Sequence, residues 1–364
     1  MEIKLSLCMI VKNEENVLAR CLEGIKSAVD EIIIADTGST DKTKEIAKFF
    51  GAKVYDFPWK DDFSSARNFS FSKATGDYLL WLDADDVIET ASLDRLYALK
   101  KRLALTPADT VMCAYITAID ENGNPTFKFY RERIVSAKSK PVWQGFIHEY
   151  IEQKGEIIYS DFYVTHLKPT ERVLKNPFRN LNIYIKNISQ GEVLSARDKY
   201  YYGRELYYNK LYDESIAVLN SALKEKNLWY VNAIEALTVI ADCQAEMKNS
   251  DEAISALYKT FDYGAPRASV LYRLGKLYAD RGLYDASIIF LKGALSAKDC
   301  TIEGDFDEAK YRNLYPLIEL TYCYSMLNDN DTAYEYHRRA KKISETDLSV
   351  KHNDEYFSSL GYNG

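Results

Sequence analysis

The sequence predicts an α/β domain with a mostly parallel sheet, followed by an all-α domain of helical repeats. Two observations lead to this fold class. Short apolar runs alternate with helical patterns over residues 4–103, and from about Glu171 onward similar helix-turn-helix patterns take their place. Strand–helix alternation is typical of parallel sheets covered by helices on both faces. Repeated helix pairs are typical of solenoids, in which each pair buries its apolar face against the next.

The expected sheet is built around residues 78–82, an unbroken apolar run between the turn at Gly76–Asp77 and a group of aspartates. An unbroken run suits a strand buried on both faces. Right-handed crossovers place the carboxyl ends of parallel strands at one edge, where ligands of such sheets bind. The other early strands are expected at 4–11, 31–35 and 53–56, and the helices between them at 17–25, 41–50 and 63–73.

Three polar clusters follow these strands and should meet at that edge: Lys12–Glu14, Asp36–Ser39 and Asp83–Asp86. On a strand, Asp83 and Asp85 would point to the same side. Two neighbouring carboxylates repel, and a hard divalent cation that also holds phosphates would relieve the repulsion. An acidic helix-capping loop explains an isolated Asp-X-Asp equally well, but three successive clusters favour a nucleotide-diphosphate site with a metal. Neither GxGxxG nor GxxxxGK[ST] occurs, so no dinucleotide fingerprint or P-loop is predicted.

The second part of the α/β domain contains a predicted helix at 90–103 and a hairpin of strands 110–119 and 126–135 around a turn at 120–123. Two later stretches each carry a histidine, His148 before Glu149 and His166 at the end of an apolar run. A lone histidine is more often structural than catalytic. A His-Glu pair after a glycine, in a chain with a predicted metal site, favours function.

Composition excludes several classes of function. A net charge of −7 argues against a general nucleic-acid binder. No apolar run approaches the ~20 residues needed to span a bilayer, so we expect no integral membrane association. The first residues run directly into a strand pattern, without a signal segment. Six scattered cysteines without a CxxC pair indicate buried thiols in a reducing compartment, so we expect a cytoplasmic protein.

The repeats are marked by Asp213, Asp251, Asp285 and Asp331, which are 38, 34 and 46 residues apart. Each should begin the second helix of a pair, and a period near 34 is the tetratricopeptide signature. The longest interval leaves a loop at about 299–307. A concave surface for a peptide or protein, a dimer contact, and a purely structural cover for the first domain all remain open. The expected organisation is a catalytic domain at 1–170, a linking helix at 171–195, repeats at 196–345 and a tail at 346–364.

Six stretches resemble family 2 glycosyltransferases with the GT-A fold. In order they are LSLCMIVKNEE, DEIIIADTGSTDKT, DDFSSARNFS, GDYLLWLDADD, GFIHEYI and THLKPTERVLKNPFRNL, and together they cover roughly residues 3–181. The resemblance is to bacterial β-glycosyltransferases of the lipopolysaccharide-core type, and to bacteriocin S-glycosyltransferases that carry a tetratricopeptide tail.

The resemblance implies a role for each matching position. Asp85 would bind Mn²⁺ or Mg²⁺ with Asp83 and His166, Ala84 would lie between the two aspartates beside the nucleotide sugar, and Arg67 would reach the nucleotide phosphates. An ion pair of Arg67 with Asp61 or Asp62 is the simpler alternative. Glu149 would be the catalytic carboxylate. His148 would contact the acceptor or belong to the metal shell, and Trp143 would contact the acceptor. The nucleoside pocket would be formed by Val11, Lys12, Asn13, Glu14, Asp36, Thr37, Gly38 and Ser39.

The implied reaction moves a hexose from a UDP-sugar with inversion at the anomeric carbon. We expect a peptide or protein acceptor (Ser, Thr or Cys) held by the repeats, which could also form a homodimer. Two alternatives remain: an enzyme that builds a lipopolysaccharide or capsule glycan, and a tetratricopeptide adaptor whose transferase domain is inactive. Where relatives often read Arg-Leu-Phe-Arg, this chain reads Tyr130-Arg131-Glu132-Arg133, so no role is assigned to Arg131 or Arg133.

Overall fold

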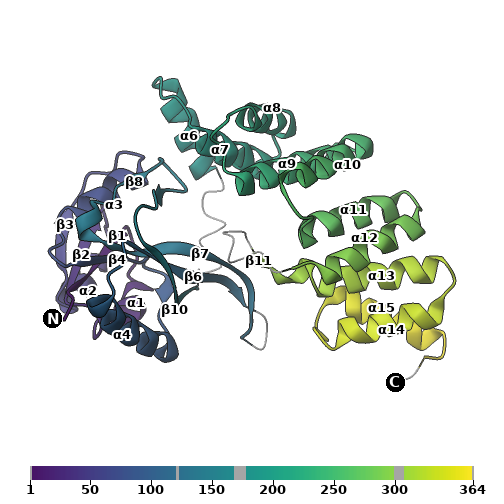
Figure 1. Cartoon of the computed structure of the whole chain (residues 1–364), viewed down its shortest axis with the longest axis horizontal. Helices are drawn as coiled ribbons and strands as arrows, with labels where there is room; N and C mark the ends of the chain where they lie inside the picture. Colours follow the sequence, from purple (N-terminus) through teal and green to yellow (C-terminus); the bar gives the residue numbers. More distant parts are fainter. Residues whose placement is uncertain (1, 120–122, 168–177, 299–306, 363–364) are drawn as a thin grey trace. The chain divides into compact units, whose positions relative to one another are not determined.

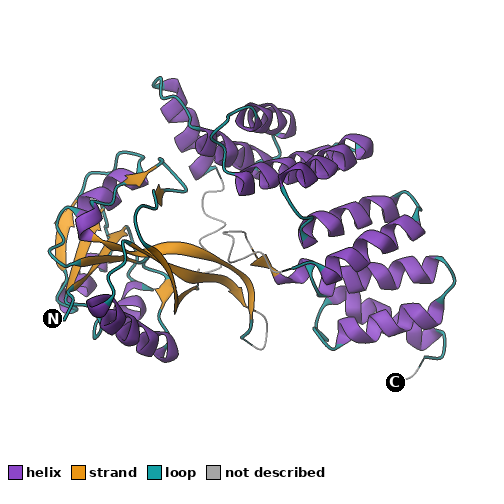
Figure 2. Ribbon diagram, viewed as in Figure 1, coloured by secondary structure: helices purple, strands orange, loops and turns teal. Residues whose placement is uncertain are grey.

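The computed structural model describes residues 2–119, 123–167, 178–298 and 307–362, and the chain divides into two compact units, Met1–Val193 and Leu194–Gly364. The first unit is mixed α/β and the second is helical (Figures 1 and 2). The predicted fold class is therefore confirmed. The expected turn at 120–122, the start of the linking helix at 175–177, the loop at 299–306 and Cys300 lie outside the described residues.

The sheet of the first unit has the strand order β3-β2-β1-β4-β7-β6-β10-β5. Strands β3, β2, β1 and β4 are all parallel, β7 is inserted antiparallel between β4 and β6, and β6 runs parallel to β10. The short β5 pairs antiparallel with β10. The strands are β1 (Leu5–Val11), β2 (Glu31–Asp36), β3 (Lys53–Asp56), β4 (Tyr78–Trp81), β5 (Asp86–Val87), β6 (Thr110–Ile119), β7 (Pro125–Ser136) and β10 (Ile157–His166), and a separate ribbon pairs β8 (Trp143–Gln144) with β9 (Tyr150–Ile151).

Helices pack on this sheet through apolar faces that the sequence predicts. In α1 the buried residues are Leu18, Cys21, Leu22 and Ile25, which is the three-and-four spacing of one helix face. They join a core whose central strand residues, including Leu7 and Leu80, have no exposed surface. The helices of this layer are α1 (Leu18–Ile25), α2 (Thr43–Phe49), α3 (Phe63–Phe71) and α4 (Thr90–Leu105). A further helix, α6 (Arg179–Ser189), lies inside the span expected for the linking helix.

The strand directions bring the carboxyl ends of β1, β2, β3, β4, β6 and β10 to one edge of the sheet, because β7 reverses direction and β6 reverses it again. One expectation at this edge is wrong. Strand β4 ends at Trp81, and residues 83–86 form a turn in which the Asp86 amide donates to the Asp83 carbonyl at 3.1 Å. The Asp86 carboxylate closes the turn by accepting from the Asp83 amide at 2.9 Å. Because the chain has left the strand, Asp83 and Asp85 do not follow strand alternation.

The described residues of the second unit contain four helix pairs, and each predicted aspartate lies in the first turn of a second helix. The residue two positions before each second helix has a positive φ, at Lys210, Lys248, Gly282 and Asn328. A left-handed residue at the same place in every pair gives the four turns one geometry. The pairs are α7 (Ala196–Tyr208) with α8 (Tyr212–Leu223), α9 (Tyr230–Glu246) with α10 (Ser250–Lys259), α11 (Ala268–Asp280) with α12 (Tyr284–Ser296), and α13 (Leu314–Met326) with α14 (Asn330–Lys341).

The segment expected as a tail contains a further helix, α15 (Leu348–Ser359). The Asp347 carboxylate caps it by accepting from the Ser349 and Val350 amides. Val350 and Phe357, two turns apart on one face, are buried. The helix thus covers the apolar face that α14 would otherwise expose. No helix among the described residues is long and apolar enough to cross a membrane, and the five described cysteines are buried and free, as predicted.

Candidate functional site

The loops after β1 and β2 are joined by hydrogen bonds into one polar surface. The Asn13 amide donates to Ser39 Oγ at 3.0 Å, and the Asn13 side chain accepts from the Thr40 amide at 2.8 Å. Thr37 Oγ1 donates to the Val11 carbonyl at 3.1 Å. Glu14 is tied to α2 through its amide, which donates to Thr43 Oγ1 at 2.7 Å. The structure thus brings together the residues expected around a nucleoside.

Asp36 is the buried centre of this surface, with 1% of its area exposed. Its Oδ1 accepts from the amides of Gly38 and Ser39 at 3.0 and 2.9 Å and lies 3.6 Å from Lys44 Nζ. The turn requires glycine at position 38, where φ is +105°. The other oxygen, Oδ2, is buried and has no hydrogen-bond partner among the described residues. A buried carboxylate oxygen without a partner costs free energy, and a ligand N–H or O–H would satisfy it.

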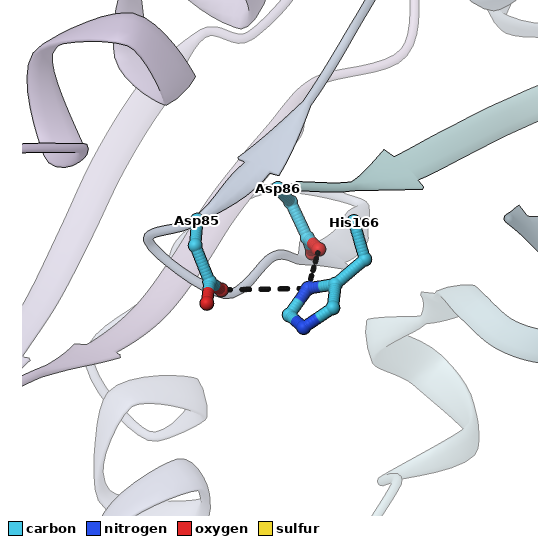
Figure 3. A group of neighbouring side chains, drawn as sticks. All are labelled: Asp85, Asp86 and His166. Carbon is cyan, nitrogen blue, oxygen red and sulfur yellow. Dashed lines mark hydrogen bonds and ion pairs between the residues drawn. The ribbon is translucent and has the colours of Figure 1, made fainter. Parts of the chain in front are cut away.

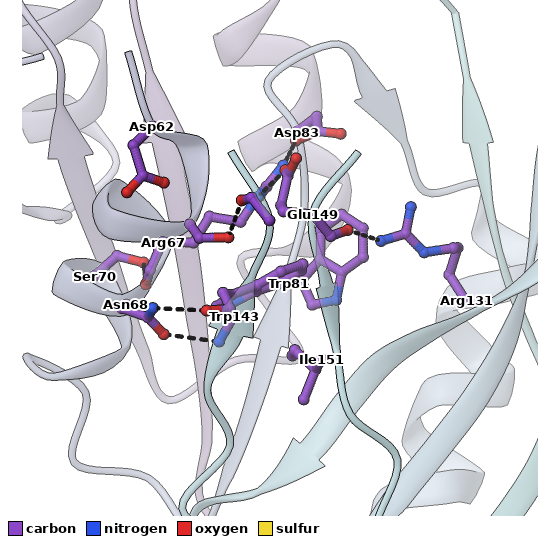
Figure 4. A network of polar contacts seen from close by, with 12 residues as sticks. Asp62, Arg67, Asn68, Ser70, Trp81, Asp83, Arg131, Trp143, Glu149 and Ile151 are labelled. Atoms are coloured by element: carbon purple, nitrogen blue, oxygen red, sulfur yellow. Dashed lines mark hydrogen bonds and ion pairs between the residues drawn. The ribbon is translucent and has the colours of Figure 1, made fainter. Parts of the chain in front are cut away.

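Arg67 on α3 links two carboxylates from distant parts of the chain (Figure 4). Its Nε donates to Glu149 Oε1 at 2.6 Å and its Nη2 to Asp83 Oδ1 at 2.7 Å. The guanidinium lies 4.8 Å from the ring centre of Trp81 and 4.9 Å from that of Trp143. Burial alone would raise the pKa of Asp83, but the charge of Arg67 and its neighbours lowers it to about 2. The simpler alternative, an ion pair of Arg67 on the helix surface, is not what forms.

Helix α3 also fixes the loop that carries Glu149. The Asn68 side chain makes two hydrogen bonds to the backbone of Trp143. Its Nδ2 donates to the Trp143 carbonyl at 3.0 Å, and its Oδ1 accepts from the Trp143 amide at 2.9 Å. The Trp143 side chain is 2% exposed and packs edge-on against Trp81. Trp143, expected at the acceptor, thus lies in the wall that holds Arg67. His148 precedes Glu149 in a left-handed conformation, φ 53°, and is partly exposed.

Asp85, Asp86 and His166 form a compact group at the carboxyl edge of the sheet (Figure 3). His166 Nδ1 lies 3.4 Å from Asp85 Oδ1 and 3.2 Å from Asp86 Oδ1. One ligand atom from each residue lies within 4.8 Å of the others. Burial raises the pKa of Asp85, and the charges of Asp83 and Asp86 raise it further. Carboxylates and an imidazole suit Mn²⁺, and a cation would relieve this crowding of negative charge, so the residues fit a divalent metal.

Two predicted metal residues, Asp85 and His166, are therefore together, whereas Asp83 is paired with Arg67. Ala84 is buried within the turn between them. Asp86 belongs to the group although no role was expected for it. The sequence offered one signal for it, since Asp86 is the third aspartate in Asp83-Ala84-Asp85-Asp86. The register of β5 against β10, which sets Asp86 opposite His166, is visible only in the structure.

A hollow of about 290 Å³ opens beside His166. The hollow is lined mostly by uncharged residues, which lie at the ends of β6 and β10. The Thr117 hydroxyl is buried there without a hydrogen-bond partner among the described residues. Its lining residues are Thr117, Ala118, Ile119, Thr165, His166 and Leu167.

Comparison with known proteins finds that residues 6–158 match the model of glycosyl transferase family 2. The matched span contains the three strand-end loops and Glu149, and it stops before His166.

The curated relatives include a TPR repeat-containing protein and glycosyltransferases. The chain is 53% identical over 83 residues to a TPR repeat-containing protein of Synechococcus elongatus, covering 23% of this chain and 21% of that protein. It is 26% identical over 224 residues to the SPbeta prophage-derived glycosyltransferase SunS of Bacillus subtilis, covering 59% and 52%. A glycosyltransferase of Rickettsia typhi is 38% identical over 93 residues, covering 26% and 32%. The chain spans about half the length, or less, of these relatives.

Solved structures superpose loosely on this chain. Glucosyl-3-phosphoglycerate synthase from Mycobacterium tuberculosis, in complex with Mn²⁺, UDP and phosphoglyceric acid, aligns with a TM-score of 0.35 at 16% identity, covering 53% of this chain and 81% of that one. MamA aligns with a TM-score of 0.38 at 18% identity, covering 48% and 92%. At these scores the superpositions add nothing to the fold described above.

Proposed function

We propose that this protein is an inverting, metal-dependent glycosyltransferase that moves a hexose from a UDP-sugar to a Ser, Thr or Cys side chain of a peptide or protein. The observation that carries the proposal is the convergence at one sheet edge of an unsatisfied Asp36 oxygen, the Asp85–His166 pair and Glu149. Each supplies one part of the reaction: nucleotide binding, a metal site and a base. The family 2 match over residues 6–158 supports the same reaction class.

The donor would lie across the loops after β1, β2 and β4. Asp36 Oδ2 would accept a hydrogen bond from the nucleoside, and the Asn13–Ser39 contact fixes the two loops around it. Asp85 and His166 would hold the cation. When bound, Mn²⁺ or Mg²⁺ stabilises the negative charge of the diphosphate leaving group.

Glu149 would take the proton from the acceptor as the new bond forms. Arg67 holds the carboxylate through Oε1, and we assign the proton to Oε2. The same Arg67 fixes Asp83, so one guanidinium sets the spacing between the base and the turn that carries Asp85. With Glu149 behind the anomeric carbon, a single displacement inverts its configuration. A thiol acceptor, which ionises more easily than a hydroxyl, would depend less on Glu149.

The peptide acceptor is supported by the resemblance to bacteriocin S-glycosyltransferases that carry tetratricopeptide tails. It is also supported by the four helix pairs, a type of array that offers extended surfaces to partners. A lipopolysaccharide or capsule acceptor is the second candidate, supported by the other branch of the same resemblance. An adaptor with an inactive transferase domain is the third, and the intact Asp85, Glu149 and His166 argue against it.

The full chain should be incubated with UDP-hexoses and Mn²⁺, and peptides encoded beside its gene should be analysed by mass spectrometry. We expect the mass of one hexose on one peptide, lost when EDTA is added. Glu149→Gln should lower transfer to a hydroxyl about 10²–10⁴-fold, while UDP binding stays unchanged. Glu156→Gln, an exposed glutamate of the same unit, is the control. Transfer to a lipid-linked glycan instead would defeat the peptide acceptor, and no turnover of any UDP-hexose would favour the adaptor.

A further inference from the structure

We propose that Asp86, held by Arg133 and Tyr115, is a positioning residue that orients the His166 ring so that Nε2 is presented to the metal. This inference rests on the metal site of the proposed function. It assigns a different role to each aspartate of the turn, since Asp85 binds the cation and Asp86 holds the imidazole.

Both oxygens of Asp86 are already occupied by protein donors. Oδ1 accepts from Tyr115 Oη at 2.9 Å and lies 3.2 Å from His166 Nδ1. Oδ2 accepts from Arg133 Nη1 at 3.1 Å and from the Asp83 amide at 2.9 Å. A carboxylate offers about four lone-pair sites, and these four contacts fill them. The side chain also has no exposed area, so a cation would have to displace existing partners to reach it.

Asp85 differs in each of these respects. Its side chain is 11% exposed, and its contact in this group is the longer one, 3.4 Å to His166 Nδ1. In Figure 3 both dashed contacts end on Nδ1, but Asp86 lies beyond that nitrogen whereas Asp85 lies to the side of the ring, and Nε2 is at the end of the ring away from Asp86. Asp85 is therefore the carboxylate available to a cation, and Asp86 is the one committed to the ring.

The support behind Asp86 is buried as deeply as Asp86 itself. Arg133 has no exposed side-chain area, and its guanidinium lies 3.7 Å from the ring centre of Trp81 and 4.1 Å from that of Tyr115. Arg133 Nη1 also donates to the Trp81 carbonyl at 3.2 Å, at the end of β4. A buried arginine is costly unless paired, and this pairing fixes the Asp86 carboxylate in one orientation.

The contact from Asp86 to Nδ1 determines which ring nitrogen carries the proton. A neutral imidazole that donates through Nδ1 leaves Nε2 with a free lone pair, which is the form that binds a metal. Carboxylates that hold metal-binding histidines in this way typically change metal affinity 10–100-fold when removed. The antiparallel pairing of Asp86 with His166 across β5 and β10 makes the contact a consequence of sheet register.

The test compares Asp86→Asn, Tyr115→Phe and Asp85→Asn in the full chain, with Asp161→Asn, an exposed aspartate on the same strand as His166, as the control. Two quantities are measured. Mn²⁺ binding is followed by electron paramagnetic resonance of the free ion, and the His166 ring is followed in metal-free protein by ¹H–¹⁵N long-range correlation at alkaline pH. His166→Gln assigns the ring signals.

We expect Asp86→Asn to weaken Mn²⁺ binding about 10–100-fold and to shift the His166 ring away from the Nδ1–H form. Tyr115→Phe should cause smaller changes in the same direction, and it carries the test if Asp86→Asn does not fold. Wild-type Mn²⁺ affinity together with an unchanged His166 tautomer in folded Asp86→Asn would overturn the proposal. Complete loss of Mn²⁺ binding in Asp86→Asn, equal to that in Asp85→Asn, would also overturn it by making Asp86 a ligand. If the wild type binds no divalent cation, the metal site of the proposed function fails, while the tautomer still tests the Asp86 contact.

Discussion

The two units of this chain bury polar groups for different purposes. At the carboxyl edge of the sheet, the buried polar residues include charged ones, among them Asp36, Arg67, Asp86 and Arg133. Their hydrogen-bond partners follow no recurring pattern. In the repeats fewer charged side chains are buried, Glu205 and Arg267 among them, and several buried polar groups are neutral and recur in pairs. Thr238 and Thr321 both donate to the carbonyl four residues earlier, and Ser215 and Ser287 both contact a cysteine.

This difference indicates where the chain trades stability for chemistry. Buried charges stabilise a fold poorly unless fully paired, so a concentration of them marks a site with a chemical task. The recurring neutral groups mark packing contacts that equivalent positions make in different helix pairs. Gly203 and Gly275 belong to the second kind, since each faces a leucine sixteen residues later, Leu219 and Leu291.

Replacing Arg67 with alanine should cost about 3 kcal/mol of unfolding free energy, because Glu149 and Asp83 lose their shared cation and two tryptophans lose their partner. Urea unfolding of the full chain measures the loss. Arg95→Ala is the control, because Arg95 also lies over a ring, that of Tyr163, but is exposed. Equal losses in the two variants would mean that the ion pairs of Arg67 contribute no more to stability than the contacts of an exposed arginine.

Replacing Asp85 with asparagine should lower hexose transfer at least about 100-fold, yet leave the metal-free protein as stable as the wild type or more so. The sign follows from the pKa of Asp85, which burial and the neighbouring carboxylates raise in the folded state. The folded protein therefore loses stability as pH rises from the pKa of Asp85 in the unfolded chain to its higher pKa in the folded chain. At neutral pH the charged Asp85 carboxylate destabilises the fold, and the neutral asparagine side chain removes that destabilisation.

Thermal unfolding without metal and UDP release with Mn²⁺ are the two measurements for Asp85→Asn. Asp94→Asn, at an exposed position on α4, should change neither. Lower stability of Asp85→Asn would contradict the view that this carboxylate is kept for function.

Replacing Gly275 with alanine should cost about 1–3 kcal/mol, because the new Cβ would lie 2.7 Å from Cδ2 of buried Leu291. Gly293→Ala is the matched control within the same helix pair. Its Cβ would meet Leu271 at 3.5 Å, an ordinary contact, so better helix propensity should leave stability equal or raise it by up to about 1 kcal/mol. Denaturant unfolding separates the two, and UDP release should be unchanged in both. A change in UDP release would show that the repeats influence the reaction.

Replacing Gly282 with alanine should cost about 0.5–1 kcal/mol. Its φ of +74° strains any residue with a Cβ, while no atom lies within 4 Å of the added methyl group. The same turn position holds Lys210, Lys248 and Asn328 in the other pairs, so the repeats tolerate this strain. A loss above 2 kcal/mol in thermal or urea unfolding would mean that the third turn is built differently from the other three.

Local patterns in the sequence predict the helices and strands and their order. Strand β3 and strand β6 have the predicted bounds, and the four aspartates locate the four second helices, because apolar periodicity and helix-turn chemistry are local properties. The sequence also brought Val11, Asn13 and Asp36 to one edge, since right-handed parallel connections leave no other arrangement.

Which charged side chains meet depends on the three-dimensional fold. Strand β7 enters between β4 and β6 and delivers Arg133 to Asp86, and helix α3 delivers Arg67 to Asp83 and Glu149. These pairs join residues 16 to 82 positions apart. The pairing of side chains across a sheet depends on register and on where each strand ends, which apolar periodicity does not encode. For the same reason the turn after Trp81, and with it the division of roles between Asp83, Asp85 and Asp86, emerged only from the fold.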